Sequence, residues 1–250
     1  ESPPAEPKPI SARPGRVEDL VKTVSASRLG LWQTCRLKFY YRYVAGLMKP
    51  PTGARHAGRV VHAVLQAWSK ARWRKESFPL ETSKALFETG WKDQGKEGMI
   101  DWEGEEEKQR RSAWSLLELY FGQSPIPSDE KPEAVEVSVE TDLARHGLPV
   151  LRGILDLVRP QGRIVDFKTS AQTPNAESVV HLHETQTSCY SILYRECTGY
   201  MEGGVELHHL VKTKQPKLVI TSVGPMDLRQ RDRLFRSIES YVEGVGRRDF

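Results

Sequence analysis

A Pro-Gln-Gly triplet centred on Gln161 lies between two apolar segments, and it restricts the fold of this chain more than any other feature. Residues 149 to 159 and 163 to 169 are rich in Val, Ile and Leu, which is typical of strands, and the triplet favours a turn between them. The pattern predicts an antiparallel hairpin. A turn centred on Gln161 sets the register so that Asp156 lies opposite Asp166, with Cβ atoms about 5 Å apart.

The period of two along a strand places Lys168 on the same face as Asp166. Two opposed carboxylates repel each other, and a divalent cation would remove that repulsion. Oxygen ligands of this kind suit Mg²⁺ or Mn²⁺, and such a site supports phosphodiester hydrolysis, with Lys168 orienting water or stabilising negative charge. The alternative interpretation is a set of exposed ion pairs on a solvated sheet face.

The rest of the chain alternates between helical and strand-like patterns. Apolar residues recur at helical spacing from Arg55 to about Arg74, and this helix includes His62. Further helices are expected at residues 80–96, 105–121, 178–199 and 227–245, and further strands at 135–140, 204–212 and 217–223. The expected fold class is α/β, a mixed central sheet flanked by helices.

Residues 1–16 contain five prolines and almost no large apolar side chain, so they are expected to form an extended or disordered lead-in. The remainder, residues 17–250, has the size of a single elaborated domain. Within it, the two helices on either side of a Gly- and Glu-rich link are expected to form a helical insert at about 76–122.

Composition excludes some classes of protein and leaves others open. Lys and Arg number 37 against 33 Asp and Glu, a net charge of +4 that is compatible with a polyanionic partner without requiring one. Three cysteines argue against a disulfide framework and for a reducing compartment, the cytoplasm. No apolar run approaches the length of a membrane span, so no membrane partner is expected.

Five short patterns follow one another between residues 25 and 190. They are Ser25-x-Ser27-x-Leu29 with Cys35 and Phe39-Tyr40-Tyr41, then Gly58-x-x-x-His62, Gly153-x-x-Asp156, Asp166-x-Lys168-Thr169 and Gln186-x-x-x-Tyr190. In this order they resemble the PD-(D/E)XK nuclease superfamily, and specifically its RecB-like branch, which includes CRISPR-adaptation exonucleases and helicase-nuclease C-terminal domains. The chain departs from the branch at Arg36, where a proline is usual.

The resemblance implies a restriction-endonuclease-like fold and a role for each matching residue. The implied metal ligands are His62, Asp156, Asp166 and the main-chain carbonyl of Phe167, the implied catalytic residue is Lys168, and the implied DNA-facing residues are Gln186 and Tyr190. The spacing of four between the last two agrees with one helix face. Taken alone, His62 would more often be a structural histidine.

The function that the resemblance implies is a Mg²⁺- or Mn²⁺-dependent DNA nuclease, an exonuclease that hydrolyses DNA from its ends and leaves 5′-phosphates. The alternative is a non-catalytic DNA-binding or scaffolding module of a recombination or CRISPR assembly. A sequence-specific endonuclease of the same superfamily is a third reading. The retained acids Asp156 and Asp166 favour catalysis, since a scaffold has no physical need for two opposed carboxylates.

Two further features leave alternatives open. Many members of the RecB-like branch carry an iron-sulfur cluster held by four cysteines, and Cys35 matches the first of these ligands. Cys189 and Cys197 lie on the Gln186-x-x-x-Tyr190 helix and are expected to be small buried residues. The presence of the cluster is therefore undecided. The aromatic run from Phe39 to Tyr43 is expected to pack in the core, with stacking on single-stranded bases as the alternative. Basic residues such as Arg55 either neutralise phosphates or form a solvated face.

Overall fold

The computed structural model describes residues 10–11, 14–93 and 100–250, and its centre is a mixed sheet of six strands. The strands of this sheet are β2 (Thr23–Ser25), β4 (Ala134–Thr141), β5 (Val150–Arg159), β6 (Arg163–Ser170), β7 (Val205–Val211) and β8 (Lys217–Val223). β2 is parallel to β5 and β6 is parallel to β7, whereas the other pairs are antiparallel. The α/β fold with a mixed sheet expected from the sequence is confirmed.

Helices cover the sheet on both faces. They are α1 (Val17–Lys22), α2 (Ala26–Thr34), α3 (Arg36–Phe39), a π-helical turn (Tyr40–Val44), α4 (Gly53–Arg74), α5 (Leu80–Lys92), α6 (Glu106–Gln123), α7 (Ala176–Thr198) and α8 (Leu228–Gly246). Every helix and strand expected after residue 50 is present within two residues of its expected bounds, except that α5 ends at Lys92 and residues 94–96 lie outside the described part of the chain.

Short elements complete the chain. Single 3-10 turns lie at Ala144–His146 and Pro160–Gly162, and the second is the turn of the predicted hairpin. A two-stranded sheet joins β1 (Ile10–Ser11) to β3 (Leu47–Met48), so the only described part of the lead-in before residue 14 is extended and paired. Within the described residues, no helix combines the length and apolar character needed to cross a bilayer.

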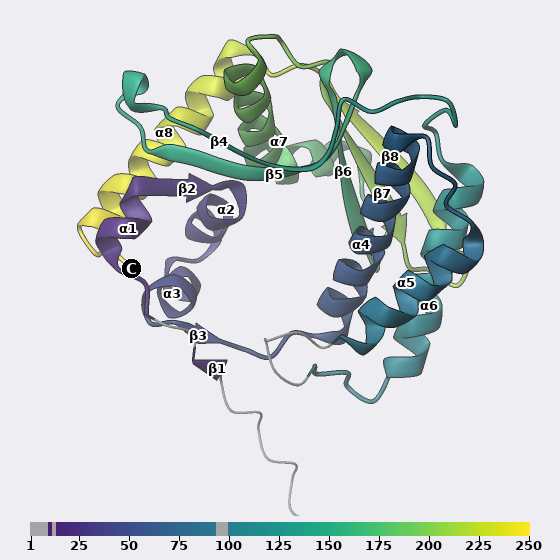
Figure 1. Ribbon diagram of the computed structural model, residues 1–250. Coiled ribbons are helices and arrows are strands. Elements are labelled where there is room, and N and C mark those ends of the chain that lie inside the picture. The colour runs from purple at the N-terminus through teal and green to yellow at the C-terminus, as the bar shows by residue number, and fades with distance from the viewer. Residues whose placement is uncertain (1–9, 12–13, 94–99) are drawn as a thin grey trace, which may run out of the picture.

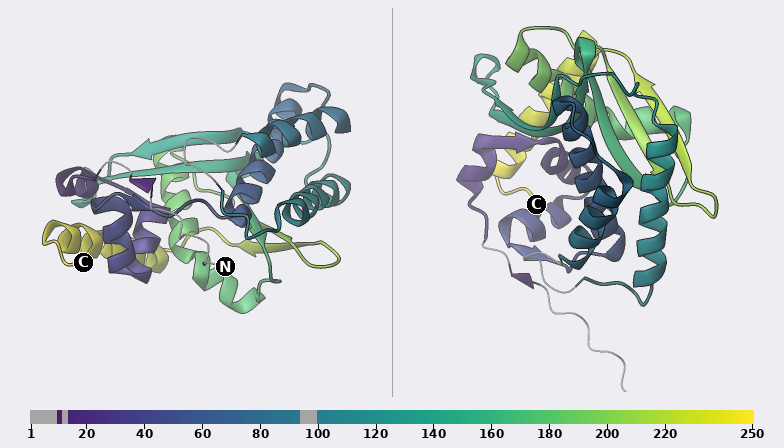
Figure 2. Two further views of the ribbon diagram at one scale, coloured as in Figure 1. Left: turned by 90° about the horizontal axis from the view of Figure 1, so that it is seen from below. Right: turned by 45° about the vertical axis from the view of Figure 1, so that its right-hand side comes forward.

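Apolar packing divides the helices between the two faces of the sheet. α4, α5 and α6 share one apolar cluster with β5, β6 and β7, whose strands contribute Leu157, Val165, Phe167 and Leu210, so the two helices expected as an insert pack against the central sheet. α7 packs on the opposite face, where Tyr190 and Tyr194 contact the strands. Figures 1 and 2 show α4, α5 and α6 grouped beyond one end of β5, with α1, α2 and α8 at the other.

One edge of β5 is divided between two partner strands. Residues 150–152 pair with β2 and residues 157–159 pair with β6, while β4 pairs with the other edge over residues 151–158. On the edge that β2 and β6 share, residues 153–156 of β5 lie between the two partners and pair with neither strand. β2 and β6 therefore fork away from β5 and leave an opening beside the Gly153-x-x-Asp156 pattern.

A close approach of α7 to β5 explains the glycine of that pattern. A Cβ atom placed on Gly153 would lie 2.6 Å from Cδ1 of Leu193, a fully buried side chain of α7. Glycine thus lets α7 pack tightly against β5. Because α7 also carries Gln186 and Tyr190, this packing brings both side chains to the opening in the sheet.

Candidate active site

A pocket of about 750 Å³ lies at the fork of the sheet. It is lined by all seven residues to which the resemblance assigns a role in the site: His62, Asp156, Asp166, Phe167, Lys168, Gln186 and Tyr190. They come from α4, β5, β6 and α7, which are far apart in the sequence. The sheet fork thus gathers side chains from four elements around one space.

Asp166 is the centre of a polar network. Its carboxylate is 4% exposed, and Oδ2 lies 2.7 Å from Nζ of Lys168. Its Oδ1 accepts hydrogen bonds from the hydroxyl of Tyr190 at 2.9 Å and from Nε2 of Gln186 at 3.0 Å. Lys168 in turn donates to Oε1 of Gln186 at 2.8 Å. These contacts fix the positions of the acid and the lysine relative to each other.

Asp156 faces the same pocket in a different environment. Its Oδ2 accepts a hydrogen bond from the backbone N–H of Phe167 at 3.0 Å and lies 3.5 Å from Nδ1 of His62. Burial, and then the negative charge of Asp166, raise the pKa of Asp156 to about 7. Burial is also the main cause that lowers the pKa of His62, so the neutral imidazole is favoured.

The family model of the PD-(D/E)XK nuclease superfamily matches residues 23–250, which is most of the chain. This chain belongs to the PD-(D/E)XK nuclease superfamily. Membership implies a metal-dependent nuclease with DNA as its substrate. No curated protein matches the sequence.

One solved structure shows the same fold as the nuclease. A crystal structure described as "Putative exonuclease" from Eubacterium rectale is similar with a TM-score of 0.60 at 12% identity, over 94% of this chain and 85% of that chain. A second structure, of a protein named SSO0001, has a TM-score of 0.38 at 10% identity over 89% of this chain and 76% of that chain. The first likeness shows that the restriction-endonuclease-like architecture expected from the sequence is present.

The hairpin register of the nuclease agrees with the sequence prediction except at the site itself. Leu157 pairs with Val165, as the turn at Gln161 predicts. The ladder ends there, so the expected direct pairing of Asp156 with Asp166 is wrong. On its other edge β6 pairs with β7 from Ile164 to Ser170, and on the β5 side the Asp156 carboxylate accepts the hydrogen bond from Phe167 N–H. The fork separates the strands where the two acids project.

The chemistry of the pocket residues fits a divalent cation, although no preformed cage is present. Within the described residues, no group of three or more His, Cys, Asp or Glu side chains is arranged to hold a metal ion. The available donors are carboxylate oxygens and one imidazole, and Oδ2 of Asp166 is buried with no hydrogen bond of its own besides the Lys168 ion pair. A cation near Asp156 would offset the charge repulsion that raises the pKa of this acid.

Several pocket residues were not assigned to the site from the sequence. Ser25, Ser27, Ser138, Arg152 and Thr169 also line it. The period of two could have indicated Arg152, which lies on β5 two pleats before Asp156, on the face that alternates with buried leucines. Ser25 could not have been placed from strand periodicity, because β2 has only three residues and its pairing with β5 is long-range.

Glu136 adds a third carboxylate to the pocket. It lies on β4 between the pairs Val135–Leu157 and Val137–Leu155, across from Asp156, and its negative charge also raises the pKa of Asp156. Its φ of 49° is in the left-handed region, which costs a non-glycine residue about 1–3 kcal/mol and is characteristic of functional sites. The period of two along β4 places Glu136 and Glu140 on one strand face, where either a role in the metal shell or a solvated edge would explain them, and the pocket includes only Glu136.

We expect Glu136→Gln to lower DNA cleavage about 10- to 100-fold, because the variant removes a charge that supports the cation site without removing a primary acid. The measurement is the cleavage rate across a Mg²⁺ titration, in which the variant should need more cation for half-maximal rate. Glu140→Gln is the matched control, since Glu140 lies on the same strand and forms an exposed ion pair with Arg152. Equal rates for the two variants would remove Glu136 from the site.

The cysteines of the nuclease are reduced and dispersed. Cys189 is buried in α7 as expected, but Cys197 is exposed, which corrects the expectation of a buried residue. Cys35 is exposed and accepts a hydrogen bond from the N–H of Lys38 at 3.5 Å. These three thiols do not form a metal-binding group in the described part of the chain.

Proposed function

We propose that this protein is a Mg²⁺- or Mn²⁺-dependent exonuclease of the RecB-like branch, which hydrolyses phosphodiester bonds from DNA ends and leaves 5′-phosphates. The observation that carries the proposal is the convergence of Asp156, Asp166 and Lys168 on one pocket together with His62 and Gln186. We further infer that residues 17–250 form one nuclease domain, since α5 and α6 share an apolar cluster with strands of the central sheet. A cytoplasmic location stays a prediction.

Each residue is proposed to have a separate role. His62, Asp156, Asp166 and the carbonyl of Phe167 hold the cation, with Glu136 near them. When bound, the cation supplies positive charge that polarises the scissile phosphate. Lys168 provides a positive charge beside Asp166 and stabilises the negative charge that develops on the phosphate, or orients the attacking water.

Gln186 and Tyr190 have a positioning role and a substrate-facing role in this proposal. Gln186 accepts from Lys168 and donates to both Asp166 and the Tyr190 hydroxyl, the last at 2.6 Å. This arrangement keeps the lysine ammonium and the carboxylate in a fixed geometry before substrate binds. Both residues line the pocket, so a DNA strand that entered it would contact them.

The alternative is a non-catalytic DNA-binding or scaffolding module in a recombination or CRISPR assembly. A scaffold does not require a carboxylate and a lysine locked together by an amide, nor three acids around one pocket. Such a cluster raises the electrostatic cost of folding. The retained network therefore favours catalysis.

End dependence separates an exonuclease from an endonuclease. We expect linear DNA to be degraded with Mg²⁺ or Mn²⁺ while closed circular DNA of the same sequence persists, and the products to be substrates for a 5′-phosphate-dependent ligase. The measurement is a time course on both substrates with gel and mass analysis of the products. Circular DNA cut as fast as linear DNA would refute the exonuclease.

A further inference from the structure

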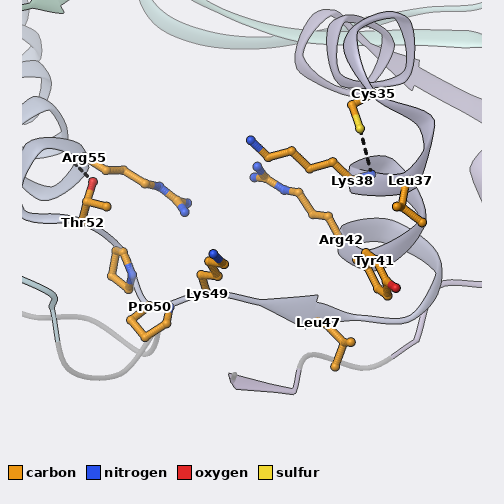
Figure 3. Close-up of a pocket in the computed structure, with 11 residues that line it drawn as sticks. Cys35, Leu37, Lys38, Tyr41, Arg42, Leu47, Lys49, Pro50, Thr52 and Arg55 are labelled. Carbon is orange, nitrogen blue, oxygen red and sulfur yellow. Dashed lines mark hydrogen bonds between the residues drawn. The ribbon is translucent and has the colours of Figure 1, made fainter. Parts of the chain in front are cut away.

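A second pocket, of about 630 Å³, lies between the α3 region and the N-terminus of α4. Four basic residues line it: Lys38, Arg42, Lys49 and Arg55. Figure 3 shows Lys38 and Arg42 reaching into the space from one side, Arg55 from the opposite side, and Lys49 from the segment below. We name these four residues and the space between them the basic pocket.

Three of the four basic residues contribute positive charge that no acidic residue of the described chain neutralises. No acidic residue lines the basic pocket, and Lys38, Arg42 and Lys49 form no ion pair within the described chain. Several positive charges around one concave space repel one another, and they raise the local concentration of anions. The basic pocket therefore fits an anionic ligand with more than one charge.

Exposed apolar side chains stand beside these charges. Leu37, Tyr41 and Leu47 line the same pocket and are 56%, 47% and 42% exposed. Phe39, from the same aromatic run, is fully buried and packs against Trp32, so the expected core packing holds for Phe39 but not for Tyr41. A free phosphate needs only the charges, whereas single-stranded DNA presents phosphates and unstacked bases together.

The basic pocket is linked to the active-site pocket by two helices. α4 carries Arg55 at the first and His62 at the second, and seven residues of helix correspond to about 10 Å. α2 begins beside Ser27 at the active-site pocket and ends next to Cys35 at the basic pocket. Figure 1 shows α2 and α3 across from α4, and α4 contributes a lining residue to each pocket.

We propose that the basic pocket binds the phosphates of a single DNA strand a short distance from the scissile bond, with Tyr41 stacking on a base. This inference rests on the proposed nuclease function. It names a single strand because a duplex hides its base faces from Tyr41. The site would hold the strand while its end lies in the active-site pocket.

The test compares two charge-reversal variants with the same change in net charge. Lys38→Glu/Lys49→Glu alters the basic pocket, and Lys84→Glu/Lys214→Glu alters two exposed lysines that do not line it. The dissociation constant of a fluorescent single-stranded oligonucleotide is measured by anisotropy in EDTA over a range of salt. We expect the dissociation constant to rise about tenfold or more in the first variant only. In that variant the slope of the logarithm of the binding constant against the logarithm of the salt concentration should fall in magnitude by about 1.4.

Tyr41→Ala separates single-strand recognition from general attraction to DNA. We expect single-stranded binding to weaken about fivefold or more and blunt duplex binding to change by less than twofold. Equal dissociation constants for both charge-reversal variants would overturn the basic pocket as a DNA site, and equal losses for the two DNA forms would overturn the single-strand assignment. Because binding is measured without cleavage, a wild-type protein that binds but cleaves nothing refutes only the proposed nuclease function.

Discussion

Asp166→Asn is expected to abolish DNA cleavage, with a loss of at least about 1000-fold. The carboxylate is the most buried acid of the site and is held by Lys168, Gln186 and Tyr190. An amide cannot supply the negative charge that binds a cation, and charge stabilisation by such a cation contributes several kcal/mol to phosphoryl chemistry. The measurement is the release of labelled nucleotides from linear DNA at saturating Mg²⁺.

Loss of folding must be separated from loss of chemistry in this variant. Asparagine keeps an oxygen for the hydrogen bonds from Tyr190 and Gln186, and it relieves the repulsion with Asp156. The variant should therefore unfold cooperatively on heating and bind single-stranded DNA at least as tightly as the wild type. A folded Asp166→Asn variant that cleaves DNA at the wild-type rate would refute the role of Asp166.

The second large effect is expected at Lys168. Lys168→Gln should lower the cleavage rate about 100- to 1000-fold, because it removes the positive charge beside the reacting phosphate. The concentration of Mg²⁺ for half-maximal rate should stay within a few-fold of the wild type, since Lys168 is not a cation ligand. This pattern differs from that of Glu136→Gln, which changes the cation dependence.

Lys168→Arg provides a second arm of the same experiment. The ammonium of Lys168 lies between Oδ2 of Asp166 and Oε1 of Gln186, at 2.7 and 2.8 Å. A planar guanidinium is larger and cannot take this compact position, so arginine should not restore activity despite its charge. Lys84→Gln, at an exposed lysine of α5, is the control. Full activity of Lys168→Gln would show that charge at this position is not used.

The sequence predicted the parts of the fold that depend on local pattern. The turn at Gln161 and the alternation around it fixed the true register of Leu157 with Val165. Helical spacing located α4 with His62, and a spacing of four located Gln186 and Tyr190 on one face of α7. These features follow from side-chain period and turn chemistry, which neighbouring residues determine.

The features that the sequence did not predict depend on contacts between distant segments. β2 is three residues long, too short for a period, yet its pairing with β5 forms one arm of the fork. The β5–β6 ladder ends at Leu157 and Val165, before Asp156 and Asp166 can pair. Glu136, the third acid of the pocket, has a left-handed φ. Neither departs from an ordinary strand pattern in the sequence, because long-range pairing and backbone strain leave no local signal.

The dependence of DNA cleavage on a divalent cation and on Asp166 tests whether the pocket is a metal-dependent nuclease site. Linear end-labelled DNA is incubated with the wild type and with Asp166→Asn in Mg²⁺, in Mn²⁺ and in EDTA, and the released label is followed with time. We expect the wild type to release label with either cation but not in EDTA, and to regain activity when excess Mg²⁺ is added back, whereas Asp166→Asn should release none under any condition. Degradation that persists equally in EDTA or in the variant would contradict a metal-dependent nuclease site at Asp156, Asp166 and Lys168.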